Sequence, residues 1–402
     1  MLGRARARQR TPLRAQHGRR PCLPRPPHHH KMSTTNLAAK ERKVLKGLIV
    51  PCALGALSWL SVHPALAQEP VNLLRPPTVA PANAPALSPL LLPDRDGINT
   101  IRSTNAWNAR RETLKREWAG ILGEFPKQKP AFRAEVLETE EFPEMTRQHV
   151  RYQVEEGVFT DGYLLAPRGR QGRRPGVVVF HQTVRTHAQQ PAGVDASNPE
   201  LTTGVQLVKR GYVVLCPRCF IFDDGTNYLG NVSLMQKRHP AWTGMARMTW
   251  DGIRAADFLE AQPNVDKSRL GAIGHSLGAK EVLYAAAFDG RYQVAVFSEG
   301  GIGMGFSNWE APWYLGPQIK KAEFKRDHHE LIALIAPRAF LLLAGESADG
   351  DRSWPFIAAA RPIYGMLGAS DNLGWLNHRA GHRYPPNAQE IAGEFLDRHL
   401  KP

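Results

Sequence analysis

The sequence predicts an α/β protein with a mostly parallel central sheet, helices on both faces of the sheet and an antiparallel N-terminal edge. After Pro175, short apolar runs alternate with helical stretches, which is typical of strands joined by crossover helices. These runs are apolar at almost every position, as expected of strands covered on both faces. Before Pro175, three extended runs are separated by turn residues, which indicates an antiparallel ladder.

The expected elements follow one another in a regular order. A helix is predicted over 105–122, because its composition favours a helix and Gly123 and Pro126 end it. The antiparallel edge comprises the runs 132–138, 149–155 and 158–166. The remaining predicted strands are 176–180, 212–215, 270–273, 294–297, 339–343 and 373–376. The helices predicted among and after them are 201–210, 250–261, 277–287, 355–367 and 388–400.

The N-terminal segments differ from the rest of the chain in charge. Residues 1–31 carry nine basic and no acidic side chains, and residues 32–67 contribute a net +3. Only +3 of the total charge of +15 therefore belongs to the residues after Ala67, which argues against a basic nucleic-acid-binding surface.

Residues 32–67 have the pattern of a secretory signal peptide. A basic segment precedes an apolar stretch, and Ala65-Leu66-Ala67 forms a cleavage site of small residues. The apolar stretch is too short for a secure membrane span, so we expect a secreted or periplasmic protein cut near Ala67. A signal normally begins near its initiator, so Met32 is the expected start, with 1–31 an upstream segment or a basic tail. Residues 68–100 are rich in proline and are predicted to be a flexible linker before a catalytic domain over 101–402.

Two of the four cysteines, Cys216 and Cys219, fall in the expected mature chain as Cys-Pro-Arg-Cys. Such a pair can be a redox couple, half of a zinc site or a local disulfide. No second C-x-x-C is present to complete a tetrahedral metal site. We therefore expect structural cysteines, with a local disulfide as the alternative, and we predict no metal and no organic cofactor.

The stretch Gly274-His275-Ser276-Leu277-Gly278 fits the G-x-S-x-G pattern between a predicted strand and a predicted helix. Glycines at these positions let the backbone turn sharply, so that the serine stands exposed above the carboxyl ends of the strands. The helix that follows favours developing negative charge at its N-terminus. Ser276 is therefore the predicted nucleophile, and a packing turn is the alternative.

A nucleophilic serine requires a base and an acid, in the chain order Ser, acid, His. His382 lies between the last predicted strand and the last helix and is the predicted base, with His378 as its competitor. Asp351 is the preferred acid, because it follows the strand before the last and Pro355 comes four residues later. Asp349 is the fallback, and Glu299, which closes the preceding strand, is a third candidate.

The predicted oxyanion hole consists of the backbone N–H groups of Gln182 and Leu277. Gln182 follows the strand 176–180, where this arrangement offers a donor, and Leu277 follows the nucleophile. An insert between Glu299 and Leu331 is rich in glycine and aromatic residues and is expected to wall a substrate pocket. Its Trp309 and Trp313 are candidates to stack on a sugar or an acyl group, with ordinary packing as the alternative.

These motifs resemble the α/β-hydrolase superfamily over about residues 130–402. Within it, "HQT", "PAG", "LVKRGYVVLCPR", "IGHSLGAKE", "FSEGGIG" and "GHRYPP" resemble the dienelactone-hydrolase and acetyl-xylan-esterase-like branch. Dienelactone hydrolases use cysteine as the nucleophile, whereas this chain has Ser276. A second, partial resemblance is to glucuronoyl esterases, which carry a lysine four residues after the nucleophile and a glutamate closing the next strand. Lys280 and Glu299 stand at those places, although Leu277-Gly278-Ala279 departs from the glucuronoyl pattern Ser-Arg-x-Gly-Lys.

The resemblance implies an exported serine hydrolase that cleaves carboxylic esters through an acyl-enzyme. The expected substrate is a small-molecule or carbohydrate ester of the acetyl-xylan type. The second resemblance implies a sugar-acid esterase in which Lys280 contacts the substrate, whereas a solvated Lys280 would have no such role. The same fold also accommodates a serine peptidase, or a degenerate binding module that has lost its catalytic chemistry.

Overall fold

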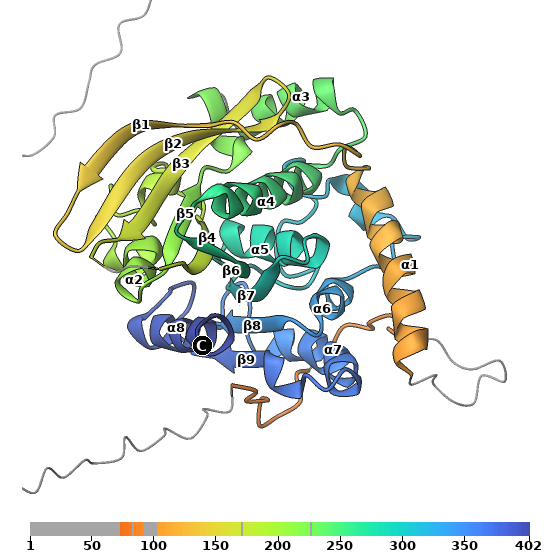
Figure 1. Cartoon of the computed structure of the whole chain (residues 1–402). Coiled ribbons are helices and arrows are strands. Elements are labelled where there is room, and N and C mark those ends of the chain that lie inside the picture. The colour runs from red at the N-terminus through yellow and green to blue at the C-terminus, as the bar shows by residue number, and fades with distance from the viewer. Residues whose placement is uncertain (1–72, 83, 92–102, 170–171, 226) are drawn as a thin grey trace, which may run out of the picture. The chain divides into compact units, whose positions relative to one another are not determined.

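A nine-stranded sheet forms the centre of the computed structural model, which describes residues 73–82, 84–91, 103–169, 172–225 and 227–402 (Figure 1). The strand order is β1-β2-β3-β5-β4-β6-β7-β8-β9. Pairing is antiparallel from β1 to β5 and parallel from β5 to β9, which confirms the predicted fold class. The strands are β1 (Ala134–Glu141), β2 (Met145–Glu155), β3 (Val158–Pro167), β4 (Arg174–Phe180), β5 (Val213–Pro217), β6 (Val265–His275), β7 (Tyr292–Ser298), β8 (Ala339–Ala344) and β9 (Leu373–Asn377).

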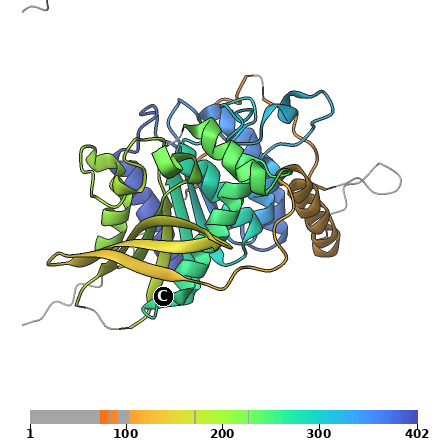
Figure 2. The ribbon, with the colours of Figure 1, turned by 90° about the horizontal axis from the view of Figure 1, so that it is seen from above.

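Helices cover both faces of the sheet (Figures 1 and 2). One face carries α1 (Thr104–Leu122), α4 (Gly244–Ala261), α5 (Leu277–Phe288), α6 (His329–Ile335) and α7 (Trp354–Met366). The other face carries α2 (Thr203–Lys209) and α8 (Pro386–Leu400). Successive side chains of β4 alternate between these layers, because Val178 belongs to the first core and Val177 and Val179 to the second. Burial on both sides explains the continuous apolar runs of the parallel strands.

Two helices of the structure have no counterpart among the predicted elements. The helix α3 (Tyr228–Arg238) buries only Asn231, Val232 and Met235, so its apolar pattern is weak. In contrast, every residue of α6 is buried, and a short helix that is buried all round shows no helical periodicity.

Parts of the proline-rich segment before α1 pack against the rest of the described chain. Leu73 and Leu90 are buried, at 5% and 6% exposure. Trp375 of β9 donates its backbone N–H to Leu73 O at 2.8 Å, and Arg75 N donates to Trp375 O at 3.1 Å. Residues near Leu73 and Leu90 of the predicted linker are thus held in place, whereas Val79 between them is 76% exposed. A few buried leucines and bridging hydrogen bonds fix a segment whose composition shows no periodicity.

The predicted tail and signal peptide, residues 1–67, lie outside the described residues. Of the cysteines that the structure describes, Cys216 and Cys219 are both buried and free, so they form no disulfide. Burial raises the pKa of both thiols, which suits packing rather than reactivity. Among the described helices, none combines the length and apolarity needed to cross a membrane.

Candidate active site

Ser276 stands on a strained turn between β6 and α5. Its φ of 58° and ψ of −116° place a residue other than glycine in a left-handed conformation. Its backbone N–H donates to Ser298 O at the end of β7, at 2.8 Å, which holds the turn in place. The turn therefore presents the serine side chain at the carboxyl edge of the parallel strands.

The two glycines of the motif are required by close packing of the backbone. A Cβ on Gly274 would collide with the backbone of Gly278, and a Cβ on Gly278 would collide with the carbonyl group of Phe180. These contacts bring the start of α5 directly against the end of β4. The glycine spacing that identified the motif in the sequence is thus a steric requirement of the turn.

The structure joins Ser276, His382 and Glu299 in one chain of hydrogen bonds. Ser276 Oγ lies 3.0 Å from His382 Nε2, and His382 Nδ1 lies 3.1 Å from Glu299 Oε2. With its proton on Nδ1, the imidazole donates to the carboxylate and accepts from the serine hydroxyl. His378, the competing histidine, instead accepts the backbone N–H of Ala380 at 3.1 Å.

Glu299 is held rigidly at the end of β7. Its side chain is fully buried, and its own φ of 51° turns the backbone sharply at the strand end. Its carboxylate accepts the backbone N–H groups of Gly345, Ala348 (2.9 Å) and Asp349 (3.2 Å) from the loop after β8. Several donors to one buried carboxylate fix its orientation toward His382.

Asp351, the acid preferred from the sequence, lies elsewhere. Its carboxylate accepts from Asn377 Nδ2 at 2.8 Å and from Arg379 Nη2 at 2.7 Å, near the protein surface. The ranking of Asp351 ahead of Glu299 is therefore corrected, since Glu299 is the acid that contacts His382.

Asp349, the fallback acid, links two loops beside the site. It accepts the backbone N–H groups of Gly301 (2.6 Å) and Ile302 (2.8 Å) and the hydroxyl of Ser353 (2.7 Å). These bonds tie the loop after Glu299 to the loop after β8. Burial raises the pKa of Asp349 to about 6, against the opposing effect of these hydrogen bonds.

The predicted oxyanion donors lie at the expected strand and helix ends. Leu277 is the first residue of α5, where a backbone N–H has no intrahelical acceptor. Gln182 follows β4 and lines the same hollow as Ser276. The neighbouring His181 is buried, and its Nδ1 lies 2.7 Å from Gln182 O while its Nε2 accepts the N–H of Cys219. These bonds hold the loop in position.

A hollow of about 200 Å³ opens beside Ser276 and His382. Its other lining side chains include Asn198, Glu200 and Arg383, and the last two form an ion pair. Such a lining offers donors and acceptors for hydroxyl groups. Sequence reasoning missed these residues. Arg383 could have been noticed beside His382, whereas Asn198 and Glu200 lie in a loop without a motif.

The structure buries Lys280 and Trp309, the predicted substrate contacts, where α5 meets the insert after β7. Both are buried, at 2% and 0% exposure. Lys280 Nζ donates to Ser307 Oγ at 2.9 Å and Asn308 Oδ1 at 3.2 Å, and it lies 4.2 Å from the centre of the Trp309 ring. Burial lowers the pKa of Lys280 to about 7.

The contacts of Lys280 with Ser307, Asn308 and Trp309 tie α5 to the insert after β7. Trp313 is half-buried and packs edge-on against the ring of Tyr228. Lys280, Trp309 and Trp313 are all absent from the described lining of the Ser276 hollow. The contacts that the structure shows for Lys280 and Trp309 are packing contacts, and a substrate contact of either residue stays a prediction.

Comparison with known proteins agrees with the fold. Residues 160–310 match the model of the Dienelactone hydrolase family, and this segment contains both Ser276 and Glu299. The solved glucuronoyl esterase from Solibacter usitatus superposes with a TM-score of 0.66 at 20% identity, covering 79% of this chain and 100% of that chain. The chain has the α/β-hydrolase fold. A Bacteroides fragilis structure, provisionally named an acetyl xylan esterase, shares the fold with this chain at a TM-score of 0.56 and 17% identity, covering 69% of this chain and 76% of that chain.

A curated relative is the 4-O-methyl-glucuronoyl methylesterase 1 of Sodiomyces alcalophilus. It is 29% identical over 164 residues, which are 33% of this chain and 32% of that protein. The chain therefore spans about a third of the length of this relative. The homologues of this chain include carbohydrate esterases.

Proposed function

We propose that this α/β-hydrolase is a carbohydrate esterase that cleaves esters of sugar acids, of the glucuronoyl type, through an acyl-enzyme at Ser276. The observation that carries the proposal is the hydrogen bond between His382 and Glu299 at the end of β7. This is the place of the acid that the partial resemblance to glucuronoyl esterases implied. The names of the matched methylesterase and of the Solibacter usitatus structure support the same substrate class.

The geometry supports acyl transfer in two steps. Ser276 Oγ attacks the ester carbonyl carbon while its proton passes to His382 Nε2, and Glu299 stabilises the imidazolium that forms. The N–H groups of Gln182 and Leu277 bind the oxygen that becomes negative. Collapse of this intermediate breaks the bond to the alcohol, which leaves with the proton from His382.

Water then attacks the acyl-enzyme with His382 again acting as base, and the sugar acid is released. The acyl group of a sugar-acid ester carries hydroxyl groups on its ring. Asn198, Glu200 and Arg383 line the hollow where these hydroxyl groups would lie. An acetyl group has no hydroxyl groups to offer such a lining, so acetate esters are the second candidate substrate.

The test compares kcat/KM for a methyl glucuronate ester and for an acetylated xylo-oligosaccharide. We expect a preference for the glucuronate ester of at least about tenfold, which corresponds to about one additional neutral hydrogen bond. Ser276→Ala should lose both activities. A preference for the acetate ester would support the second candidate, and hydrolysis that persists in Ser276→Ala would overturn the proposal.

A further inference from the structure

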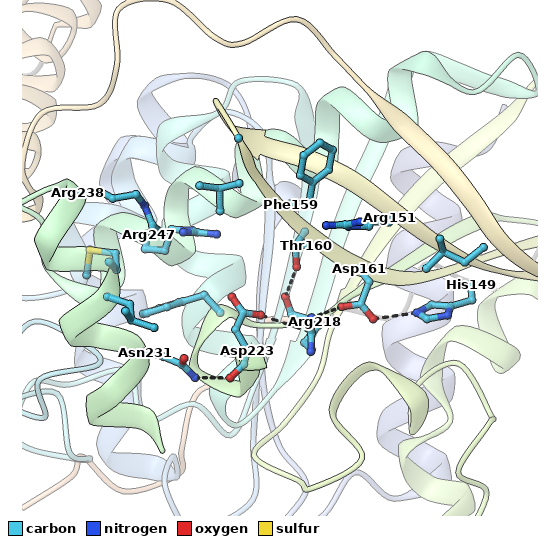
Figure 3. A pocket seen from close by; sticks show the side chains of 16 residues that line it. His149, Arg151, Phe159, Thr160, Asp161, Arg218, Asp223, Asn231, Arg238 and Arg247 are labelled. Carbon is cyan, nitrogen blue, oxygen red and sulfur yellow. Dashed lines mark hydrogen bonds and ion pairs between the residues drawn. The ribbon is translucent and has the colours of Figure 1, made fainter. Parts of the chain in front are cut away.

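A second and larger hollow, of about 520 Å³, lies between the β2–β3 hairpin, the loop after β5 and α3 (Figure 3). Its volume falls in the range of roughly 300–1,000 Å³ that is typical of small-molecule sites. In the described part of the chain, it shares no lining residue with the hollow beside Ser276, and neither serine nor cysteine lines it. This hollow is therefore separate from the hollow beside Ser276, and its described lining offers no serine or cysteine nucleophile.

Two arginines with weak ion pairs stand at its rim. The side chains of Arg151 and Arg238 are 51% and 40% exposed. Their closest carboxylate contacts, with Glu135 and Glu155 respectively, are each 3.5 Å long. The exposed Arg151–Glu135 pair contributes little, although Arg151 also lies over the Phe159 ring, 4.8 Å from its centre. Glu155 is only 9% exposed but has closer partners in His239 and Arg247, at 2.7 and 2.9 Å. Arg238 can therefore turn toward a ligand without leaving this carboxylate unpaired.

A third arginine, Arg247, forms part of the wall and has an unused hydrogen-bond donor. Its side chain is only 1% exposed. Its Nε donates to both carboxylate oxygens of Asp251, at 2.8 and 2.9 Å, and its Nη1 donates to Glu155 Oε1 at 2.9 Å. Its Nη2 is buried and has no hydrogen-bond partner among the described residues. A buried donor left unpaired is costly, but this nitrogen has almost no accessible surface, so an acceptor in the hollow reaches it only if neighbouring side chains move.

The remaining walls combine acceptors with aromatic rings. Asp161 accepts from His149 Nε2 at 2.9 Å and pairs with Arg218 Nη2 at 2.5 Å, so these charges largely balance one another. Phe159 and Phe220 add apolar surface. Figure 3 shows Arg238 and Arg247 on the α3 side of the hollow, facing Arg151 and His149 on the hairpin. Guanidinium groups, carboxylates and aromatic rings together suit a ligand with an anionic group, hydroxyl groups and an apolar ring face.

We propose that this hollow is a non-catalytic binding site for a carboxylate-bearing saccharide, a uronate-containing oligosaccharide. Arg151 and Arg238 bind the carboxylate of the ligand. The remaining carboxylates accept from sugar hydroxyl groups. This goes beyond the proposed function, because the site holds an acidic saccharide without cleaving it.

The experiment measures binding by calorimetry after Ser276 has been capped with a fluorophosphonate, which fills the catalytic hollow. The probes are a glucuronate-substituted xylo-oligosaccharide, the unsubstituted oligosaccharide of the same length, and inorganic phosphate. The acidic saccharide should bind the capped chain with one site, at least about tenfold more tightly than the neutral one, and more weakly in high salt. Failure of the capping reaction would count against the proposed function alone, and binding would then be measured on Ser276→Ala.

The decisive variant is Arg151→Gln combined with Arg238→Gln, because both side chains are at the rim and Arg247, paired with buried carboxylates, is left intact. It should weaken binding of the acidic saccharide at least about tenfold, whereas Arg361→Gln, on an exposed position of α7, should leave it unchanged. Absence of binding to the capped chain, or equal binding by the double variant, would overturn the proposal. Phosphate that binds as tightly as the saccharide would show a general anion site and would also overturn it.

Discussion

Replacement of Glu299 by glutamine should disable the site through one hydrogen bond. A carboxylate only accepts, whereas the amide of glutamine has one acceptor and one donor group. If its NH₂ faces His382, it forces the imidazole proton onto Nε2, which can no longer accept from Ser276. If its NH₂ instead faces the backbone N–H groups after β8, buried donors face one another without an acceptor. Each unsatisfied group then costs about 1–3 kcal/mol of stability.

By analogy with other triads that hold the wrong tautomer, Glu299→Gln should lower kcat by about 10⁴, or about 5 kcal/mol in activation free energy. The assay is initial-rate hydrolysis of a methyl glucuronate ester, with circular dichroism to verify folding. Asp351→Asn is the matched control, because its carboxylate contacts Asn377 and Arg379 instead of His382. Asp351→Asn should retain a kcat within a few-fold of the wild-type value. A large loss in Asp351→Asn with a small one in Glu299→Gln would refute the assignment of the acid.

Three further predictions concern the support of the site. Gly278→Ala should abolish hydrolysis or folding, because the new methyl group would collide with the carbonyl of Phe180; normal kcat in a folded variant would contradict this. The free energy of unfolding of wild type should exceed that of Asp349→Asn most strongly below pH 3.8, and this difference should shrink by up to about 3 kcal/mol as the pH rises through 6. Urea unfolding measures the difference at each pH, and a difference that does not change with pH would contradict the raised pKa of Asp349. Lys280→Met should lower the melting temperature and leave the preference between glucuronate and acetate esters unchanged, whereas an altered preference would restore Lys280 to the substrate site.

Much of the site could be predicted from local sequence. The spacing of Gly274, Ser276 and Gly278 follows from steric contacts within one turn, so a short motif is sufficient to identify it. The position of His382, between the last strand and the last helix, follows from the order of the elements.

The acid could not be chosen in the same way. Glu299 and Asp351 both follow parallel strands at the same edge of the sheet. They differ in the conformation of their loops, which depends on distant contacts. The positive φ of Glu299 and the donors contributed after β8 direct its carboxylate inward. The burial of Lys280 under the insert likewise depends on how a long loop folds back over α5.

The most direct test of the proposed chemistry is covalent labelling of the nucleophile. Only a serine activated by a neighbouring base reacts readily with a fluorophosphonate, so intact-mass analysis of the wild-type chain should show one adduct, mapped to Ser276 by peptide sequencing. His382→Ala and Ser276→Ala should each prevent labelling while remaining folded. One adduct at Ser276 that requires His382 is the predicted result; an unlabelled wild-type chain, or undiminished labelling of Ser276→Ala, would contradict it.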